Sequence, residues 1–229
     1  MYLIILVIIA VLLFLIWASA DISSGIYIKA LCKKETKDKI VALTFDDGPD
    51  SIYTEKVLDV LDRHKVKVTF FLIGRNAEIQ PEKVKRIDES GHIIAIHTYT
   101  HSSFSPFFSS NKYKEEIFKT QEIIENIINK KPLLFRPPFG VTNPTIAKVA
   151  KRLSTIGWSI RSLDTLSFLS REKIGHLVIK KAKCGDVILL HDKCKDSDIL
   201  IDTIITMLKA KGFGFRTIDE LFEIEAYDK

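Results

Sequence analysis

Short apolar runs alternate with segments of helical apolar spacing from residue 38 onward, and no other feature narrows the possible folds as much. The runs at 40–45 and 187–190 are apolar almost throughout, which is typical of strands buried on both faces of a parallel sheet. Residues 53–64 instead carry apolar side chains at helical spacing. About seven strand–helix units follow one another, and this predicts an α/β fold with one parallel sheet.

Two architectures accommodate such units, an open doubly wound sheet and a barrel. A dinucleotide-binding sheet is disfavoured, because the first strand is followed by the isolated Gly48 and not by a Gly-x-Gly-x-x-Gly turn. Strands are expected at 40–45, 66–73, 92–96, 133–135, 156–160, 187–190 and 214–217, and helices at 53–64, 81–90, 112–129, 144–153, 171–182, 198–211 and 219–224.

The N-terminal segment 1–20 is apolar and carries no charged side chain. It approaches the ~20 residues that a helix needs to cross a bilayer core. A buried core helix is disfavoured because such helices show a polar face. Residues 18–20 resemble a signal-peptide cleavage site, but the apolar run exceeds the ~7–15 residues of a signal core and no basic residue precedes it. We therefore expect a membrane anchor, with secretion after signal cleavage as the alternative.

Charge around this segment bears on its orientation. By the positive-inside rule, lysines after the segment and none before it would keep the bulk of the chain in the cytoplasm. Charge bias is weaker for long translocated domains, so it does not fix the orientation alone. The lysines are Lys29, Lys33, Lys34, Lys37 and Lys39.

The rest of the chain is expected to form a polar linker at 21–38 and one domain at 39–229. The 34 Lys and Arg residues exceed the 29 Asp and Glu residues by only five, so nucleic acid is not expected as a partner. Cys32, Cys184 and Cys194 lack metal-type spacing. A strand between Cys184 and Cys194 would hold them too far apart for a disulfide.

Ionisable side chains follow five of the predicted strands. The carboxyl ends of parallel strands share one rim of the sheet, where active sites of α/β folds lie, so these residues are expected to converge. A single such residue carries little weight, whereas five strand ends on one rim point to a functional site. The residues are Asp46 and Asp47, His97 and His101, Arg136, Asp164, and His191 and Asp192.

The pair His97 and His101 points to a metal site. Their spacing places both imidazoles on one side of a helical turn, and two imidazoles with one carboxylate are a common ligand set for Zn²⁺. Asp46 or Asp47 can supply the carboxylate, and the other acid can take a proton from water. A zinc protease of the His-Glu-x-x-His type is disfavoured, because position 98 is Thr. A purely structural role of the two histidines is the alternative.

Five motifs stand in order along the chain. Together they resemble those of the polysaccharide deacetylase family, the NodB-homology domain of carbohydrate esterase family 4, over residues 38–222. The resemblance implies a distorted (β/α)7 barrel, in agreement with the number of strand–helix units. The motifs are Thr44-Phe45-Asp46-Asp47-Gly48-Pro49, His97-Thr98-x-x-His101, Arg136-Pro137-Pro138-Phe139-Gly140, Trp158 with Asp164, and Leu189-x-His191-Asp192.

The resemblance also implies a role for each matched residue. Asp47, His97 and His101 match the family's metal ligands, usually for Zn²⁺. Asp46 matches the general base that activates the attacking water, and Arg136 matches the arginine that holds this base.

The remaining matches concern the leaving group and the substrate. His191 matches the general acid, and Asp164 matches the carboxylate that orients this histidine. The backbone N–H of Phe139 matches the family's oxyanion donor. The residues expected to contact substrate are Phe139, Leu189, Trp158 and Pro138.

The chain departs from the family pattern at three positions. Phe139 stands where Tyr is more usual, which changes little because the donor is backbone. A nearby Trp normally accompanies the Asp of the fourth motif, and Phe168 is a candidate substitute for it beside Asp164. Arg161 stands where an acid is common.

The implied activity is metal-dependent removal of N-acetyl groups from an N-acetylglucosamine-containing polysaccharide, such as peptidoglycan, a chitin-like glycan or an exopolysaccharide. An O-acetyl esterase would use the same residues. A catalytically silent glycan-binding module is the third possibility, which the intact set of ionisable residues disfavours. Action on a wall polymer implies a domain outside the cytoplasm, tethered to the membrane by residues 2–20. The aromatic loop at 104–108 is read as a sugar platform, a membrane-contacting loop or simple packing.

Overall fold

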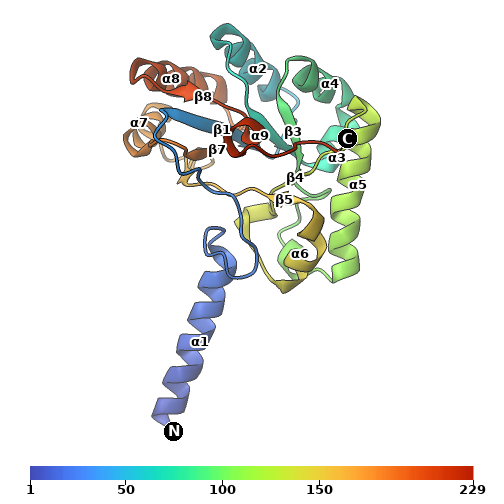
Figure 1. The fold of residues 1–229 in the computed structure, drawn as a ribbon, viewed down its shortest axis with the longest axis vertical. Helices are drawn as coiled ribbons and strands as arrows, with labels where there is room; N and C mark the ends of the chain where they lie inside the picture. Colours follow the sequence, from blue (N-terminus) through green and yellow to red (C-terminus); the bar gives the residue numbers. More distant parts are fainter. Residues whose placement is uncertain (229) are drawn as a thin grey trace.

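The computed structural model describes residues 1–228 and shows one curled sheet surrounded by helices (Figure 1). The strands are β1 (Ile40–Asp46), β2 (Thr69–Leu72), β3 (Ile93–Ile96), β4 (Leu134–Phe135), β5 (Ser154–Thr155), β6 (Ile160–Arg161), β7 (Val187–His191) and β8 (Gly214–Phe215). Their order is β5-β4-β3-β2-β1-β7-β6, and β8 pairs with β1 beside this path. The pairings between these strands are parallel, so the expected parallel sheet is confirmed.

The sheet curls because one stretch of chain, residues 154–161, contacts both of its edges. β5 pairs with β4, and β6 pairs with β7. Between them, Ile156 N donates to Phe135 O at 2.9 Å and Ser159 N donates to Val187 O at 3.0 Å. The single strand expected at 156–160 is therefore wrong. A segment that crosses from one partner to another cannot keep one regular ladder, and it forms two short strands instead.

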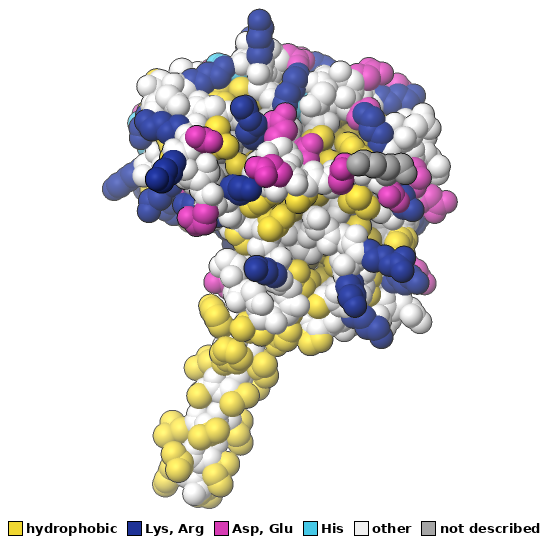
Figure 2. Space-filling model, in the orientation of Figure 1, with side chains coloured by type: hydrophobic (Ala, Val, Ile, Leu, Met, Phe, Trp, Pro, Cys, Tyr) yellow, Lys and Arg dark blue, Asp and Glu magenta, His cyan; other side chains and the backbone are white. Residues whose placement is uncertain are grey.

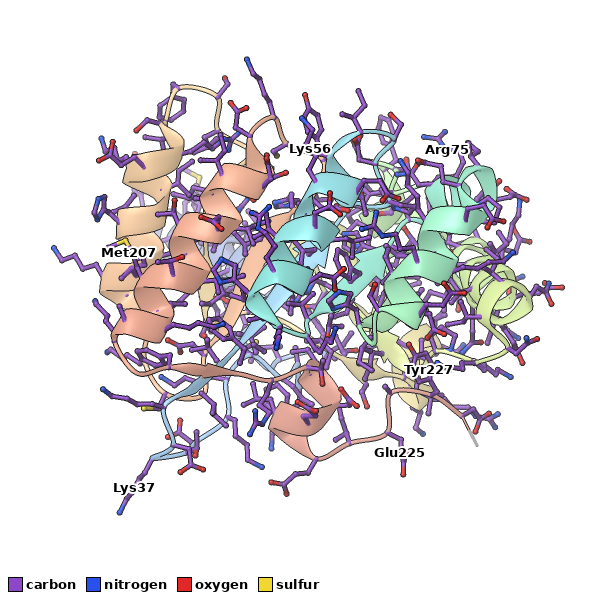
Figure 3. The ribbon with its side chains drawn as sticks, turned by 90° about the horizontal axis from the view of Figure 1, so that it is seen from above. Lys37, Lys56, Arg75, Met207, Glu225 and Tyr227 are labelled. Carbon is purple, nitrogen blue, oxygen red and sulfur yellow. The ribbon has the colours of Figure 1, made fainter. Side chains whose placement is uncertain are left out.

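Helices cover the outside of the curled sheet. They are α2 (Tyr53–His64), α3 (Gly74–Ile79), α4 (Pro81–Glu89), α5 (Ser110–Ile128), α6 (Pro144–Val149), α7 (Arg171–Lys181), α8 (Ser197–Ala210) and α9 (Ile218–Phe222), with short 3-10 helices η1 (Ser105–Phe107), η2 (Pro138–Gly140) and η3 (Ala150–Arg152). Seen from above, α7, α8, α2, α4 and α5 follow one another around the sheet (Figure 3). The sequence prediction missed α3, and the helix expected at 144–153 is α6 followed by η3.

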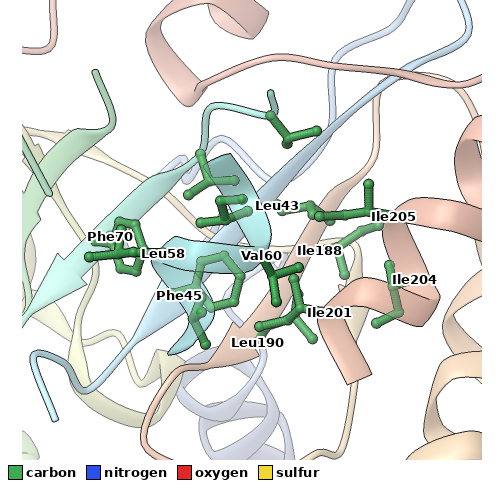
Figure 4. Packing of buried hydrophobic residues seen from close by; sticks show 14 of the residues in the cluster. Leu43, Phe45, Leu58, Val60, Phe70, Ile188, Leu190, Ile201, Ile204 and Ile205 are labelled. Atoms are coloured by element: carbon green, nitrogen blue, oxygen red, sulfur yellow. The ribbon is translucent and has the colours of Figure 1, made fainter. Parts of the chain in front are cut away.

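Alternate residues of β1 face opposite sides of the sheet. Leu43 and Phe45 face outward and pack with Ile188 and with Ile204 of α8 in the largest apolar cluster (Figure 4). Thr44, between them, faces the barrel interior, where its hydroxyl accepts a hydrogen bond from a buried arginine side chain. The inward-facing positions near the carboxyl ends of the strands are therefore the ones that reach the rim.

The N-terminal helix α1 (Tyr2–Ala20) projects from the domain (Figure 1). Among residues 1–228 it is the one helix long and apolar enough to cross a membrane. Its side chains are exposed except near its C-terminal end, where Ala18 is fully buried. Membrane anchors and signal sequences share this length and composition.

The polar stretch that follows α1 lies against the barrel. Leu31 N donates to Thr155 O at 2.9 Å, and Leu31 O accepts from Gly157 N at 3.0 Å. Further along, Lys33 Nζ lies 3.1 Å from a carboxylate oxygen of Asp186. The segment predicted to be a linker is thus bound to the domain, and this contact fixes the position from which α1 projects.

All three cysteines are free thiols.

Ile204→Ala is expected to lower the free energy of unfolding by ~2–5 kcal/mol, because Ile204 is fully buried and its truncation leaves a cavity. Ile199→Ala on the same helix is the matched control. Ile199 is 58% exposed, so this change is expected to stay within ~0.5 kcal/mol. Urea unfolding followed by circular dichroism measures both values. Equal losses in the two variants would contradict this packing.

Candidate active site

The carboxyl ends of the strands surround a cavity of about 370 Å³. It brings together strand-end residues that are far apart in the sequence, as the strand-end pattern predicts. Asp46 and His191 end neighbouring strands and lie opposite each other in the ladder between β1 and β7. The lining residues are Asp46, Asp47, His97, His101, Ser103, Phe139, Trp158, Arg161, Thr165, Leu189, His191 and Lys193.

Arg136 lies next to this cavity, inside the barrel, and is fully buried. Its Nη1 donates to Asp46 Oδ1 at 2.6 Å and to Thr44 Oγ1 at 2.9 Å. Its Nε and Nη2 donate to the carbonyl oxygens of Ile156 and Gly157 at 3.1 and 2.8 Å. Burial lowers the pKa of the guanidinium, and the Asp46 carboxylate opposes this effect. The arginine therefore holds Asp46 in one orientation toward the cavity.

Asp47, His97 and His101 bring three ligand atoms within 4.8 Å of one another. Asp47 Oδ1 lies 3.4 Å from His97 Nε2 and 3.3 Å from His101 Nε2. His97 Nδ1 lies 2.7 Å from Arg136 O, which can only accept, so the lone pair of His97 is on Nε2 and faces Asp47. In the part of the chain that the structure describes, buried Asp47 Oδ1 accepts no hydrogen bond. These donors therefore fit a divalent cation, and the set suits Zn²⁺.

Backbone turns bring the three ligands to one side. Asp47, Thr98 and His101 have φ angles of 75°, 62° and 50°, in the left-handed region that residues with side chains rarely adopt. Glu116, buried on α5, holds the loop between the two histidines. One of its carboxylate oxygens accepts the backbone N–H groups of residues 99–100 at 3.0 and 2.7 Å. The helix outside the barrel thus positions a loop at the rim.

Asp164 accepts hydrogen bonds from both the ring and the backbone N–H of His191. His191 Nδ1 donates to Asp164 Oδ1 at 2.8 Å, and His191 N donates to Asp164 Oδ2 at 2.7 Å. The other ring nitrogen, Nε2, lies 3.9 Å from Asp47 Oδ2. The Asp164 carboxylate therefore orients the His191 ring so that Nε2 points into the cavity.

Burial and neighbouring charges lower the pKa of some side chains in the cavity and raise the pKa of others. Burial opposes ionisation of Asp47, but the neighbouring histidines and Lys193 outweigh it and lower the pKa of this carboxyl. Burial and a neighbouring histidine lower the pKa of His101 to about 4, so its imidazole is neutral at neutral pH, the form that binds metals. Burial also disfavours the charged form of His191, yet Asp164 outweighs it and raises the pKa of this imidazole. His191 therefore keeps a proton to higher pH.

The residues expected to contact substrate are only partly brought together. Phe139, Leu189 and Trp158 line the cavity, whereas Pro138 is buried and is not among the described residues that line it. Phe168, the candidate aromatic of the fourth motif, is 79% exposed and lies outside this lining, so that expectation is wrong. Trp158 supplies an aromatic wall instead.

Sequence reasoning missed four of the lining residues as site residues: Ser103, Arg161, Thr165 and Lys193. Lys193 Nζ lies 2.7 Å from Asp47 Oδ2, and this pairing outweighs burial and raises the pKa of the lysine. Lys193 follows soon after the end of β7, so the strand-end rule that found His191 extends to it. Asp192, expected at the same rim, is instead fully buried and accepts a hydrogen bond from Thr54 Oγ1. Ser103 and Thr165 carry no comparable sequence signal, because they lie in loops beyond the strand ends.

Residues 33–155, more than half of the chain, match the family model described as polysaccharide deacetylase. The chain belongs to the polysaccharide deacetylase family. Membership confirms the resemblance drawn from the five motifs. It also confirms the expected enzyme class, a deacetylase that acts on carbon–nitrogen bonds other than peptide bonds.

Two similar proteins illustrate the relationship of this polysaccharide deacetylase. The peptidoglycan-N-acetylglucosamine deacetylase of Bacillus cereus is 38% identical over 194 residues, which cover 80% of this chain and 68% of that protein. The peptidoglycan-N-acetylmuramic acid deacetylase PdaA of Bacillus subtilis is 37% identical over 196 residues, which cover 83% and 74% of the two chains.

Solved structures confirm the (β/α)7 fold. The crystal structure of the Bc1960 peptidoglycan N-acetylglucosamine deacetylase in complex with a benzamide compound has a TM-score of 0.82 at 33% identity, covering 93% of this chain and 98% of that one. A protein of Bacillus anthracis described as a pseudoenzyme of the same family has a TM-score of 0.77 at 29% identity, covering 83% and 67%. Because a pseudoenzyme shares this fold, activity depends on the site residues and not on the fold alone.

Asp164→Asn is expected to lower deacetylase activity by about 10²-fold and to move the alkaline limb of the kcat/KM profile to lower pH. The reason is that Asp164 raises the pKa of His191, and a neutral amide would not, so the imidazolium would lose its proton at lower pH. Acetate release from a chitooligosaccharide, followed across pH, measures both effects. An alkaline limb that does not move would contradict the role of this pair.

Proposed function

We propose that this deacetylase uses a divalent metal to remove N-acetyl groups from N-acetylglucosamine units of peptidoglycan. One observation carries the proposal: the Asp47, His97 and His101 cluster shares one cavity with Asp46 and His191. The cluster provides a cation site, and the other two residues provide a proton acceptor and a proton donor. The Bacillus relatives named as peptidoglycan deacetylases support the choice of polymer.

Asp47, His97 and His101 would hold the metal, with Zn²⁺ as the proposed ion because two imidazoles and one carboxylate suit it. A bound divalent ion supplies Lewis acidity, which polarises a carbonyl and lowers the pKa of water. The buried hydrogen bond from His97 Nδ1 to Arg136 O keeps one ligand in the required tautomer.

The remaining residues move the protons of amide hydrolysis. Asp46, held by Arg136, takes a proton from the water that attacks the acetyl carbonyl carbon. The N–H of Phe139, at the cavity wall, donates to the oxygen that gains negative charge. When the carbon–nitrogen bond breaks, His191 gives its proton to the amine, which is otherwise a poor leaving group. Acetate and a free glucosamine unit are the products.

Asp46→Asn and His191→Ala are each expected to lower acetate release by about 10²–10⁴-fold, because each removes one proton-transfer group. A chelator should abolish the activity of the unmodified chain, and added Zn²⁺ should restore it. Asp59→Asn, which changes an exposed acid of α2, is the matched control. The substrates are peptidoglycan, acetylated chitooligosaccharides and an O-acetylated glycan.

Full activity in either catalytic variant would refute the assigned role. Acetate released only from the O-acetylated glycan would favour an esterase. A folded, metal-loaded chain without activity on any of the three substrates would favour a silent glycan-binding module.

One observation favours N-acetylmuramic acid as a second candidate substrate. Two cationic side chains, Arg161 and Lys193, line the cavity. Muramic acid differs from glucosamine by a lactyl group that carries a carboxylate, so a cation at the mouth of the site would favour it. Lys193 already pairs with Asp47, which leaves Arg161 as the cation facing a substrate.

Arg161→Gln is expected to lower kcat/KM for muramic-acid-containing glycan by roughly two- to fivefold, the contribution of a partly exposed ion pair. The kcat/KM for an uncharged chitooligosaccharide should stay unchanged, and this second substrate is the internal control. A loss of the same size on both substrates would contradict recognition of the lactyl carboxylate.

We propose further that α1 stays attached as a membrane anchor and that the domain lies outside the cytoplasm, where peptidoglycan is found. The 19-residue apolar run of α1 is longer than the ~7–15 residues of a usual signal core, which supports the first part, and the wall substrate supports the second. Protease shaving of intact cells tests the orientation, and a fully protected domain would reverse it.

A further inference from the structure

A loop beside the candidate active site exposes two aromatic side chains. Phe104 and Phe107 are 72% and 85% exposed, on and next to η1. The backbone of this loop is anchored to the domain, because Asn143 Nδ2 donates to Pro106 O at 2.8 Å and Ser105 is buried. Two exposed phenyl rings on one anchored loop at the edge of a folded domain indicate a contact surface.

The same loop lies next to the end of α1. Thr142 N donates to Ser19 O at 2.9 Å, and Thr142 Oγ1 donates to Ala18 O at 3.4 Å. Thr142 directly precedes Asn143, the residue that holds the aromatic loop. The C-terminal end of the apolar helix and the two phenyl rings are therefore fixed to adjacent residues of the domain.

A cationic hollow of about 430 Å³ adjoins this region. Four exposed cations from α5, α6 and η3 line it, and in the described part of the chain none of them lies within 4 Å of a carboxylate. Figure 1 shows α6 and the N-terminal end of α5 at the level of the last turns of α1, and Figure 2 shows Lys and Arg side chains gathered there, at the lower right of the domain. The cations are Lys114, Lys148, Lys151 and Arg152.

We propose that these elements form one membrane-contacting base, in which Phe104 and Phe107 enter the bilayer interface and the four cations bind anionic phospholipid headgroups. Aromatic rings favour the interface, and cations favour anionic lipid surfaces. The proposal rests on the anchoring of α1 proposed above. An apolar helix, exposed rings on a loop that contacts the same segment, and nearby cations without a carboxylate partner fit a bilayer better than they fit a soluble partner.

The membrane-contacting base also determines how far from the bilayer the candidate active site lies. Phe139, which lines the catalytic cavity, is three residues from Thr142, and three residues of chain span at most ~11 Å. The mouth of the cavity is thus held close to the bilayer surface. The substrate is therefore the glycan nearest to the membrane, rather than the outer layers of the wall.

The test uses the full chain, with α1, in nanodiscs of phosphatidylglycerol or of phosphatidylcholine. An environment-sensitive fluorophore is attached at Phe107→Cys or, as the matched control, at Ile199→Cys on α8, in a background with the native cysteines replaced by serine. Quenching by spin-labelled lipid should be several-fold stronger at position 107 than at position 199. Ile199 is exposed on a helix at the far end of the domain from α1 (Figure 1).

A second measurement does not depend on the labelled variants. In mixed nanodiscs, phosphatidylglycerol should be enriched around the protein, and combined Lys148→Gln and Lys151→Gln should reduce this enrichment by up to roughly fivefold per cation removed. Lys56→Gln and Lys173→Gln, on α2 and α7, are the control pair and should leave it unchanged.

The outcomes separate the two proposals. Equal, weak quenching at both positions in a chain that retains α1 would overturn the membrane-contacting base and leave the anchor and the deacetylase activity intact. Recovery of a chain cleaved after Ala20 would instead overturn the anchor. Binding of soluble poly(glycerol phosphate) by the four cations, with position 107 unquenched, would identify a polyanion site and refute the membrane contact.

Discussion

The buried guanidinium of Arg136 is the interaction on which the site and much of the barrel depend. It has no exposed surface, and its central carbon lies 4.0 Å from the centre of the Phe71 ring. It joins β1 to the stretch that crosses between the edges of the sheet, through Asp46 and the carbonyl oxygens of residues 156–157. An unpaired charge there would cost several kcal/mol, so its partners are held in place. Its own carbonyl oxygen also orients His97.

Near this arginine, side chains of the same type are suited to different roles because their neighbours differ. His101 and His191 line the same cavity, yet their pKa values shift in opposite directions. Burial, together with a neighbouring histidine, lowers the pKa of His101, whereas Asp164 outweighs burial and raises the pKa of His191. The first suits a metal ligand and the second suits a proton donor. Asp46 and Asp47 are likewise consecutive but distinct. One is bound by the arginine, and the other turns through a left-handed backbone conformation toward the histidines.

The loops at the carboxyl ends of β3 and β4 connect the proposed deacetylase activity with the proposed position at the membrane. The loop after β3 carries His101 and then the exposed aromatic residues, and the loop after β4 carries Phe139 and then the contact with α1. Two of the loops that line the candidate active-site cavity are therefore the ones that face the proposed membrane surface. An enzyme built this way would reach a glycan as it leaves the bilayer.

The sequence alone determined the parallel α/β class, the long helices and the strand-end residues of the site, because apolar periodicity and the motifs are local patterns. It also indicated the proposed metal ligands, since chemistry restricts which side chains suit a cation. Tertiary structure decided how the sheet curls, which split the strand expected at 156–160, and it excluded Phe168 from the cavity while admitting Arg161 and Lys193. It also decided that residues 21–38 bind the barrel and fix α1 beside the aromatic loop. These features depend on contacts between segments far apart in the chain, and no local pattern encodes them.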